Sequence, residues 1–364
     1  MKLVFIFILL SLKCFSQAND SLLYQTLLIE NDTERVNQLY KIGFDIRNND
    51  PEMSYEFAKK CELEALKTNS PKHMAKTYNL LGVLYYKRGN FTKAIQYQKQ
   101  ALAFNQSANN ETGIAINQTN LGNIYSDINY LQLAEQYYLK ALQTYNKTGN
   151  TLQITRCLIN LGVLKYNKKE YNAAIKQFEE ALIYANNIRE NELLASCYNN
   201  IGTILREQNK LDSALLYLEE SLKIRHLIDN EFELADSYNN IALVYVMQKN
   251  FNQAANYISL ADDIATKYDY TEALLELYHT RSLFFEAQQN YEQANIWLKK
   301  HYALKDSIQT LEKNAIELDF DDNKQTAKVE NKNIKNYTLN NLWFLISFII
   351  LLVGIPLFLI RYKR

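Results

Sequence analysis

The chain has 364 residues, of which 48% are hydrophobic and 22% charged, and its 40 basic residues balance its 40 acidic ones. This length and apolar content allow a long core, while nine Gly and three Pro leave little material for sheets and loops. A net charge of zero argues against nucleic acid as a partner. The composition therefore indicates an all-α protein that does not bind nucleic acid.

The N-terminus has the composition of an export signal. A charged start is followed by the apolar stretch LVFIFILLSL and then by small residues. We expect residues 1–17 to be a signal peptide that is removed, and residues 18–34 to form an N-terminal lead helix. Lipidation of Cys14 is an alternative, but Lys13 directly before it fits a lipoprotein cleavage site poorly.

A pattern of small residues recurs every 40 residues. YNNI, for example, begins at Tyr198 and returns at Tyr238. One register holds Gly82, Gly122, Gly162, Gly202 and Ala242; a second holds Ala94, Ala134, Ala174, Ala214, Ala254 and Ala294; a third holds Ala101, Ala141, Ala181, Ser221 and Ala261. Small residues at fixed offsets mark places where helices approach closely as repeats stack. The repeats therefore form one array rather than several domains.

Each repeat has the spacing of two helices. In YNNIGTIL, which begins at Tyr198, apolar or small residues stand at i, i+3, i+4 and i+7. A short polar break such as Glu207-Gln208-Asn209 separates this stretch from a second apolar one. The pattern predicts a chain of helical hairpins.

These motifs resemble the tetratricopeptide repeat (TPR) family, whose pattern is aromatic or Leu, Leu-Gly, Tyr, Ala, aromatic, Ala. The copy YNLLGVLYYKRGNFTKAIQYQKQAL, from Tyr78, supplies Leu81-Gly82, Tyr85, Ala94 and Ala101. The period is 40 rather than about 34, and the closing Pro is absent, so longer helices or longer joints must absorb the additional residues. The resemblance implies a TPR α-solenoid over residues 35–308, with about seven repeats of which the first and last are degenerate.

The residues beyond the repeats predict a membrane anchor. Residues 309–341 are polar and lack sustained heptads, which indicates a stalk and leaves a homodimer possible. Residues 342–360, LWFLISFIILLVGIPLFLI, are uncharged and long enough for a transmembrane helix; the alternative is a buried core helix. The basic residues 361–364 then form a cytoplasmic tail. We expect the repeats on the periplasmic, extracytoplasmic side of the cytoplasmic (inner) membrane.

The sequence contains no constellation typical of an enzyme. The four His residues lack ligand spacing, and CxxC, Gly-rich phosphate loops and nucleophile elbows are absent. Cys157 and Cys197 occupy equivalent positions of successive repeats, too far apart for a disulfide, and are interpreted, with Cys61, as small core residues. We therefore expect no enzymatic activity, no metal and no cofactor.

An asparagine recurs two residues before the small residue of the first register in four successive repeats. The bland explanation is the high Asn content of the chain. A carboxamide has one acceptor and two donors, however, which suits it to hold the backbone of an extended peptide. The resemblance implies that this helix lines a concave groove and that the asparagines form a peptide-gripping ladder. The candidate groove residues are Asn120, Asn160, Asn200, Asn240, Asn199, Asn239, Val163, Tyr166, Thr203, Arg206 and Leu243.

The order of signal, repeats, stalk and span resembles the sensor half of bacterial membrane-anchored TPR regulators. Those regulators usually continue into a histidine kinase or a DNA-binding domain, whereas this sequence ends at Arg364. Three hypotheses follow: a membrane-held scaffold, a sensor acting through a separate kinase or transcription factor, and a degenerate regulator without its output. We expect a membrane-anchored extracytoplasmic module that grips a peptide or protein partner in its concave groove.

Overall fold

The structure is a computed structural model that describes residues 22–228 and 231–310. The predicted signal peptide 1–17, the transmembrane segment 342–360 and the tail 361–364 lie outside the described residues, as does nearly all of the stalk. None of the helices in the described ranges has both the length and the apolar character that crossing a bilayer requires.

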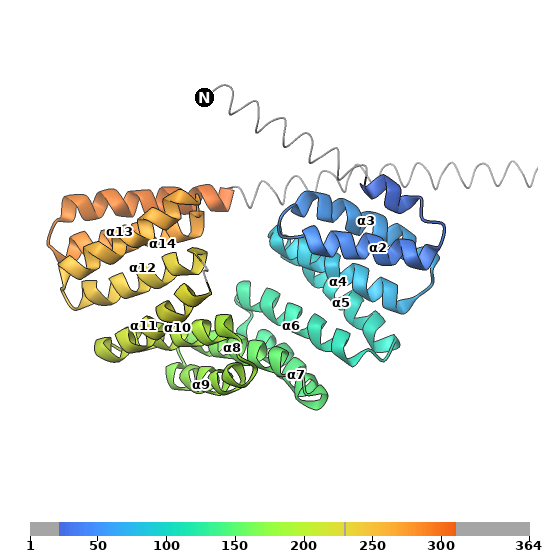
Figure 1. Ribbon diagram of the computed structural model, residues 1–364, viewed down its shortest axis with the longest axis horizontal. Helices are drawn as coiled ribbons and strands as arrows, with labels where there is room; N and C mark the ends of the chain where they lie inside the picture. Colours follow the sequence, from blue (N-terminus) through green and yellow to red (C-terminus); the bar gives the residue numbers. More distant parts are fainter. Residues whose placement is uncertain (1–21, 229–230, 311–364) are drawn as a thin grey trace, which may run out of the picture. The chain divides into compact units, whose positions relative to one another are not determined.

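The described residues fold into successive helical hairpins (Figure 1). The first helices are α2 (Asp32–Ile46), α4 (Pro71–Lys87), α6 (Glu111–Asp127), α8 (Thr151–Asn167), α10 (Asn191–Glu207), α12 (Glu231–Met247) and α14 (Thr271–Ala287). The second helices are α3 (Pro51–Lys67), α5 (Phe91–Ser107), α7 (Leu131–Thr148), α9 (Tyr171–Ile188), α11 (Leu211–Leu227), α13 (Phe251–Lys267) and the helical residues 291–310. The all-α repeat fold predicted from the sequence is confirmed for this part of the chain.

The 40-residue period follows from the lengths of these elements. Helices α4, α5 and α6 each have 17 residues, and three residues separate one from the next. Two such helices and two such turns make up one period. Each helix is about 25 Å long at about 1.5 Å per residue. The residues added to the usual repeat therefore lengthen the helices, and the joints stay short.

The turns are short because the sequence closes each helix and starts the next within three residues. Left-handed residues recur at the turn centres, among them Asn129, Lys169, Asn209 and Lys249 with φ of 62°, 60°, 60° and 58°. After the turn centre Gly89, the Asn90 N–H returns to the Tyr85 carbonyl at 2.9 Å, which is the long hydrogen bond of a Schellman motif. The Asn90 side chain then accepts the Lys93 N–H at 3.1 Å and caps α5.

The small residues lie where the helices of a hairpin touch. A Cβ atom on Gly162 would lie 2.8 Å from ring carbons of Phe178, and one on Gly202 would lie 2.7 Å from Leu218 Cγ. The largest apolar cluster continues from Ala115 in α6 to Val244 in α12. Neighbouring repeats therefore share one core, as expected for units that cannot bury their own apolar faces.

The first helices line one side of the array. Each of α4, α6, α8, α10 and α12 packs against the first helices of both neighbouring hairpins, whereas successive second helices among the described residues do not pack against one another in this way. Consecutive first helices are therefore closer together than consecutive second helices, and they lie on the inner side of a curve (Figure 1). We call the surface of the first helices that faces away from the second helices the inner face.

The N-terminal boundary differs from the predicted one. Within the expected lead helix 18–34, the structure describes helical residues 22–27, then a break, and α2 begins at Asp32 rather than at residue 35. The break ends at Asn31 because its side chain accepts the Glu34 N–H at 2.9 Å and caps α2. The compact unit that contains the hairpins ends at Ile308.

Candidate functional site

The predicted asparagine ladder lies on the first helices, and its amides bond to the protein itself. Asn120 Nδ2 donates to Asn79 Oδ1 at 2.9 Å. Asn160 Nδ2 donates to Asn123 Oδ1 at 3.1 Å, and Asn240 Nδ2 donates to Asn199 Oδ1 at 3.1 Å. Each of these bonds joins a first helix to the first helix of the preceding hairpin. Donors that the sequence assigned to a peptide backbone are thus partly used between repeats.

Other predicted groove residues differ in their surroundings. The Asn200 amide donates to the Ser196 carbonyl of its own helix at 2.8 Å and makes no bond between repeats among the described residues. Arg206 donates to Asn240 Oδ1 at 3.1 Å and pairs with Glu207 at 3.0 Å. The remaining side chains of this set are half-buried, namely Val163, Tyr166, Thr203 and Leu243.

Asn239 does not belong to an accessible groove surface. It is buried, with 7% of its surface exposed, and its Oδ1 atom is enclosed without a hydrogen-bond partner in the described structure. The prediction that it contacts a partner is therefore wrong. Its register position faces the helix packing in α12, whereas the equivalent Asn199 in α10 stays half-buried and accepts a bond from Asn240.

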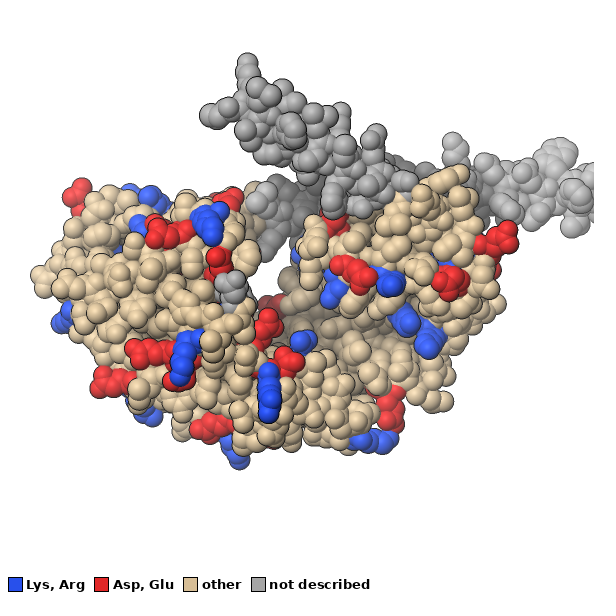
Figure 2. All heavy atoms as spheres, in the orientation of Figure 1, with Lys and Arg blue, Asp and Glu red and all other residues tan. Residues whose placement is uncertain are grey.

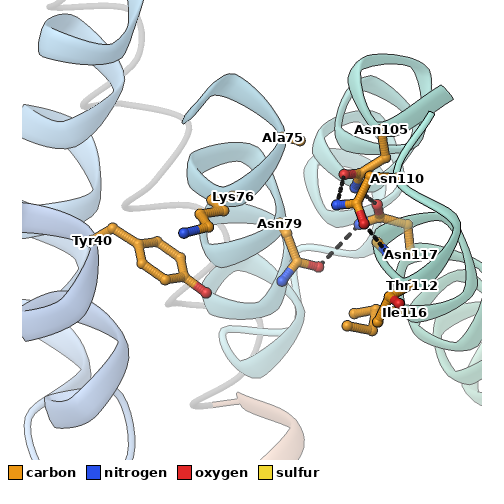
Figure 3. A pocket seen from close by; sticks show the side chains of 10 residues that line it. Tyr40, Ala75, Lys76, Asn79, Asn105, Asn110, Thr112, Ile116 and Asn117 are labelled. Atoms are coloured by element: carbon orange, nitrogen blue, oxygen red, sulfur yellow. Dashed lines mark hydrogen bonds between the residues drawn. The ribbon is translucent and has the colours of Figure 1, made fainter. Parts of the chain in front are cut away.

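A cluster of amides that the sequence analysis missed fills the junction of α4, α5 and α6 (Figure 3). Its members are Asn79, Gln98, Asn105, Asn110, Asn117 and Asn120. Gln98 and Asn117 are fully buried, at register positions that the next repeat fills with Tyr138 and Cys157. Polar residues in two registers that are otherwise mostly apolar or small were the signal that could have revealed it. We call these six residues the amide cluster.

The hydrogen bonds of the amide cluster run in one direction. Asn110 caps α6 by accepting the Gly113 N–H at 3.2 Å, and its Nδ2 donates to Asn105 Oδ1 at 2.7 Å. Asn105 Nδ2 donates to Asn117 Oδ1 at 2.7 Å, and Asn117 Nδ2 donates to Asn79 Oδ1 at 3.0 Å. A backbone N–H can only donate, so the Gly113 amide determines the orientation of every carboxamide that follows.

A second backbone group sets the same orientation from the other end. Gln98 Nε2 donates to the backbone carbonyl of Asn79 at 3.1 Å, and a carbonyl can only accept. Gln98 Oε1 must then accept, and it does so from Asn117 Nδ2 at 2.8 Å. Two independent anchors therefore agree on the direction, which makes a reversal of the chain costly in this buried site.

Two hollows flank the amide cluster on the inner face. One, of about 190 Å³, lies between α2, α4 and α6, and its lining includes Tyr40, Lys76, Asn79 and Ile116 (Figure 3). The other, of about 200 Å³, lies further along α4 and α6; its lining includes Val83, Tyr86, Asn120 and Asn123. The surface between these two helices therefore offers two depressions separated by amide groups of defined orientation.

The first hollow is electropositive. Lys76 is half-buried, has no ion-pair partner among the described residues, and holds its ammonium 5.5 Å from the centre of the Tyr40 ring. Burial, together with Lys76 and Lys72, lowers the pKa of His73 below its usual value. Burial raises the pKa of Tyr40, so its hydroxyl keeps the proton at neutral pH.

The C-terminal repeats carry acidic groups at the register position that Lys76 has in α4. Asp236 of α12 occupies this position, and burial raises its pKa to about 6. Arg225, which is 4% exposed, opposes this rise, and Glu233 adds to it. Over the outer surface seen in Figure 2, by contrast, positive and negative side chains are intermixed. That surface shows no broad basic patch of the kind that nucleic acids select.

The described residues offer little chemistry. Cys61, Cys157 and Cys197 are unpaired and buried, as the sequence predicted for core residues, and burial raises the pKa of Cys157 and Cys197 to about 12. Thiols with such values are protonated at neutral pH and are poor nucleophiles. The described ranges hold no group of His, Cys, Asp and Glu side chains that could bind a metal ion. The absence of enzymatic activity and of a cofactor stays a prediction.

The chain matches one family model and several solved structures. The tetratricopeptide repeat model matches residues 70–147 and 150–225. No curated protein matches the chain. Similar solved structures include the apo form of RapI, with a TM-score of 0.64 and 14% identity over 76% of this chain and 99% of that one.

Two further structures share the fold. Aspartyl phosphate phosphatase F from Bacillus subtilis has a TM-score of 0.58 and 14% identity over 81% of this chain and 90% of that one. The Rap conjugation gene regulator of plasmid pLS20, in complex with the Phr* peptide, has a TM-score of 0.53 and 17% identity over 76% of this chain and 96% of that one. Together with the motif registers and the hairpin geometry, the family match shows that this chain is a tetratricopeptide repeat protein.

Proposed function

We propose that this protein is a binding module that holds an extended peptide, or an extended segment of a protein partner, against its inner face. The observation that carries the proposal is the inner surface between α4 and α6, where two hollows flank amide groups of defined orientation. The likeness to a gene regulator that binds the Phr* peptide supports it.

The ladder has hydrogen-bonding capacity left for such a partner. An extended backbone presents an N–H and a C=O at every residue, and each needs a partner when it is removed from water. A carboxamide can make about four hydrogen bonds. Asn160 uses one of its N–H groups toward Asn123, and Asn200 donates only within its own helix among the described residues. Half-buried Val163, Tyr166 and Leu243 add apolar contact area between the rungs.

The location of the module is a separate part of the proposal. It rests on the amino-acid sequence of residues 1–17 and 342–360, which are typical of an export signal and a membrane span. The repeats would then lie outside the cytoplasm on a single-pass membrane anchor. A second candidate function is a sensor that acts through a separate kinase or transcription factor, and the likeness to a conjugation gene regulator favours it.

Site-specific photo-crosslinking in cells tests the binding face. A photoreactive amino acid in place of Tyr166 on the inner face should capture a partner chain. The matched control places the same amino acid at Ile183 of α9, a second helix, where 65% of the side chain is exposed. Capture from Ile183 alone would refute the assignment of the inner face.

Replacing Asn200 by Ala then tests the ladder, because this amide makes no bond between repeats among the described residues. The unfolding free energy should change by less than about 0.5 kcal/mol. Loss of a hydrogen bond to a desolvated backbone group costs about 1–3 kcal/mol, so the affinity for the captured partner should fall about 5- to 150-fold. In contrast, Asn160→Ala also removes the bond to Asn123 and should lower stability by about 0.5–1.5 kcal/mol. Unchanged binding by the Asn200 variant would show that the ladder does not contact the partner.

A further inference from the structure

The hollow between α2, α4 and α6 presents hydrogen-bond donors without matching acceptors. Asn79 Oδ1 accepts from Asn117 at 3.0 Å and from Asn120 at 2.9 Å. The Asn79 nitrogen therefore points away from the amide cluster, and Figure 3 shows it on the side that faces Tyr40. It has no acceptor among the described residues, and neither does the ammonium group of Lys76 in the wall of the same hollow.

The amide oxygens of this wall are already in use. Asn110 Oδ1 accepts the Gly113 N–H, Asn105 Oδ1 accepts from Asn110, and Asn117 Oδ1 accepts from Asn105. The carboxylate of Glu111, at the start of α6, is paired with Lys147 at 2.5 Å. The first turn of α6 adds the positive end of a helix dipole on the same side.

The orientation of Asn79 is not free to change. A reversed carboxamide would point its NH₂ group at the Asn117 and Asn120 nitrogens, and those two residues are held by the chain of bonds that starts at the Gly113 N–H. Gly113 itself is required for this arrangement, because a Cβ atom there would overlap the Asn105 and Asn110 carboxamides. The buried amides behind the wall therefore determine its polarity.

We propose that this hollow is an anion subsite of the inner face, which accepts a carboxylate of the bound peptide at Asn79 Nδ2 and Lys76 Nζ. The subsite rests on the proposed peptide-binding function and adds the chemistry of one contact. The remaining members of the amide cluster act as positioning residues, since they orient Asn79 without lining a path to the ligand charge. Both a side-chain carboxylate and a C-terminal carboxylate have the required chemistry.

Three small probes test the subsite on the full chain, kept in a neutral detergent so that no other charge competes. N-acetylglycine carries a carboxylate of the C-terminal kind, and acetyl-aspartic acid methylamide carries one of the side-chain kind. Acetylglycinamide is the neutral control. With ¹⁵N-labelled asparagine, the carboxamide signal of Asn79 should shift saturably with at least one acid, about tenfold more tightly than with acetylglycinamide. The acid that binds more tightly identifies the source of the carboxylate.

Asn79→Asp reverses the polarity of the wall with almost no change in shape. One carboxylate oxygen still accepts from Asn117 and Asn120, while the other faces the hollow and pairs with Lys76. Binding of the acids should therefore fall by at least about tenfold, read from the shifts of signals lining the hollow. Asn199→Asp is the matched control, because Asn199 is the equivalent residue of α10 and likewise accepts a ladder amide, that of Asn240, at 3.1 Å. It should change the affinity less than about twofold.

Two results would overturn the proposal: equal binding of the acids and acetylglycinamide, or an unchanged affinity for the acids in the Asn79 variant. If that variant unfolds, Lys76→Gln takes its place and must weaken the acids by a similar factor. Capture of a partner from Tyr166 without any binding of the acids would reject the subsite alone. Binding of the acids without such capture would reject the proposed peptide-binding function and keep the subsite as a bare anion site.

Discussion

Replacing Gly162 by Ala should destabilise this protein, although Ala is the better helix former. Ala gains about 1 kcal/mol of helix propensity over Gly. The new Cβ atom, however, would lie 2.8 Å from the Cε1 and Cζ atoms of Phe178, well inside the ordinary contact range of 3.4–4 Å. Phe178 is fully buried, so its ring cannot swing into solvent. Overpacking of this kind costs about 1–3 kcal/mol, and we expect a net loss of about 1–2 kcal/mol.

The chain itself supplies the compensating change. Two repeats further on, Ala242 stands in the place of Gly162 and Ile258 in the place of Phe178, and both are buried. Phe178→Ile alone should leave a void and cost about 1–2 kcal/mol. In the double variant the Ile side chain makes room for the Ala methyl group, so the combined loss should be smaller than the sum by about 1–2 kcal/mol.

Urea unfolding of the full chain, followed by far-ultraviolet circular dichroism, measures this cycle. Glu180→Lys, an exposed position on the same helix as Phe178, is the control for substitution in general and should change the unfolding free energy by less than about 0.5 kcal/mol. The reasoning about close packing would be refuted if Gly162→Ala stabilised the protein by about 1 kcal/mol and the two changes were additive.

Three further predictions concern charge, the amide cluster and topology. Because burial raises the pKa of Asp236 from 3.8 to about 6, its contribution to stability is present below pH 4 and lost as the pH rises through 6, so Asp236→Asn should stabilise by about 1–3 kcal/mol at pH 7.5 but not at pH 4 in urea titrations. Gly113→Ala should lower the melting temperature, despite the helix propensity of Ala, because its Cβ would displace the carboxamides of Asn105 and Asn110; an unchanged melting temperature would contradict this packing. A reporter active only outside the cytoplasm should work when fused after Ser307 and fail after Arg364, and the reverse result would reject the proposed orientation.

The amino-acid sequence alone was sufficient for the hairpin array. The register of Gly162 and its equivalents, and the polar breaks between apolar stretches, are local features that recur at a constant offset. Each copy repeats the same short-range instruction, so the period and the close-contact positions could be predicted without knowing how the helices pack. Whether longer helices or longer joints absorb the additional residues was open in the sequence, and the 17-residue helices answer it.

The partners of the polar side chains were decided only by the tertiary structure. Asn160 and Asn200 occupy the same register, yet one donates to the neighbouring repeat and the other to its own helix. The amide cluster joins α4, α5 and α6, and its last bond links Asn120 to Asn79, 41 residues earlier. A carboxamide finds its acceptor within about 3 Å and in a narrow range of directions, so small shifts between helices change which bond forms. Periodicity in a sequence specifies which residues share a face, but not distances at that scale.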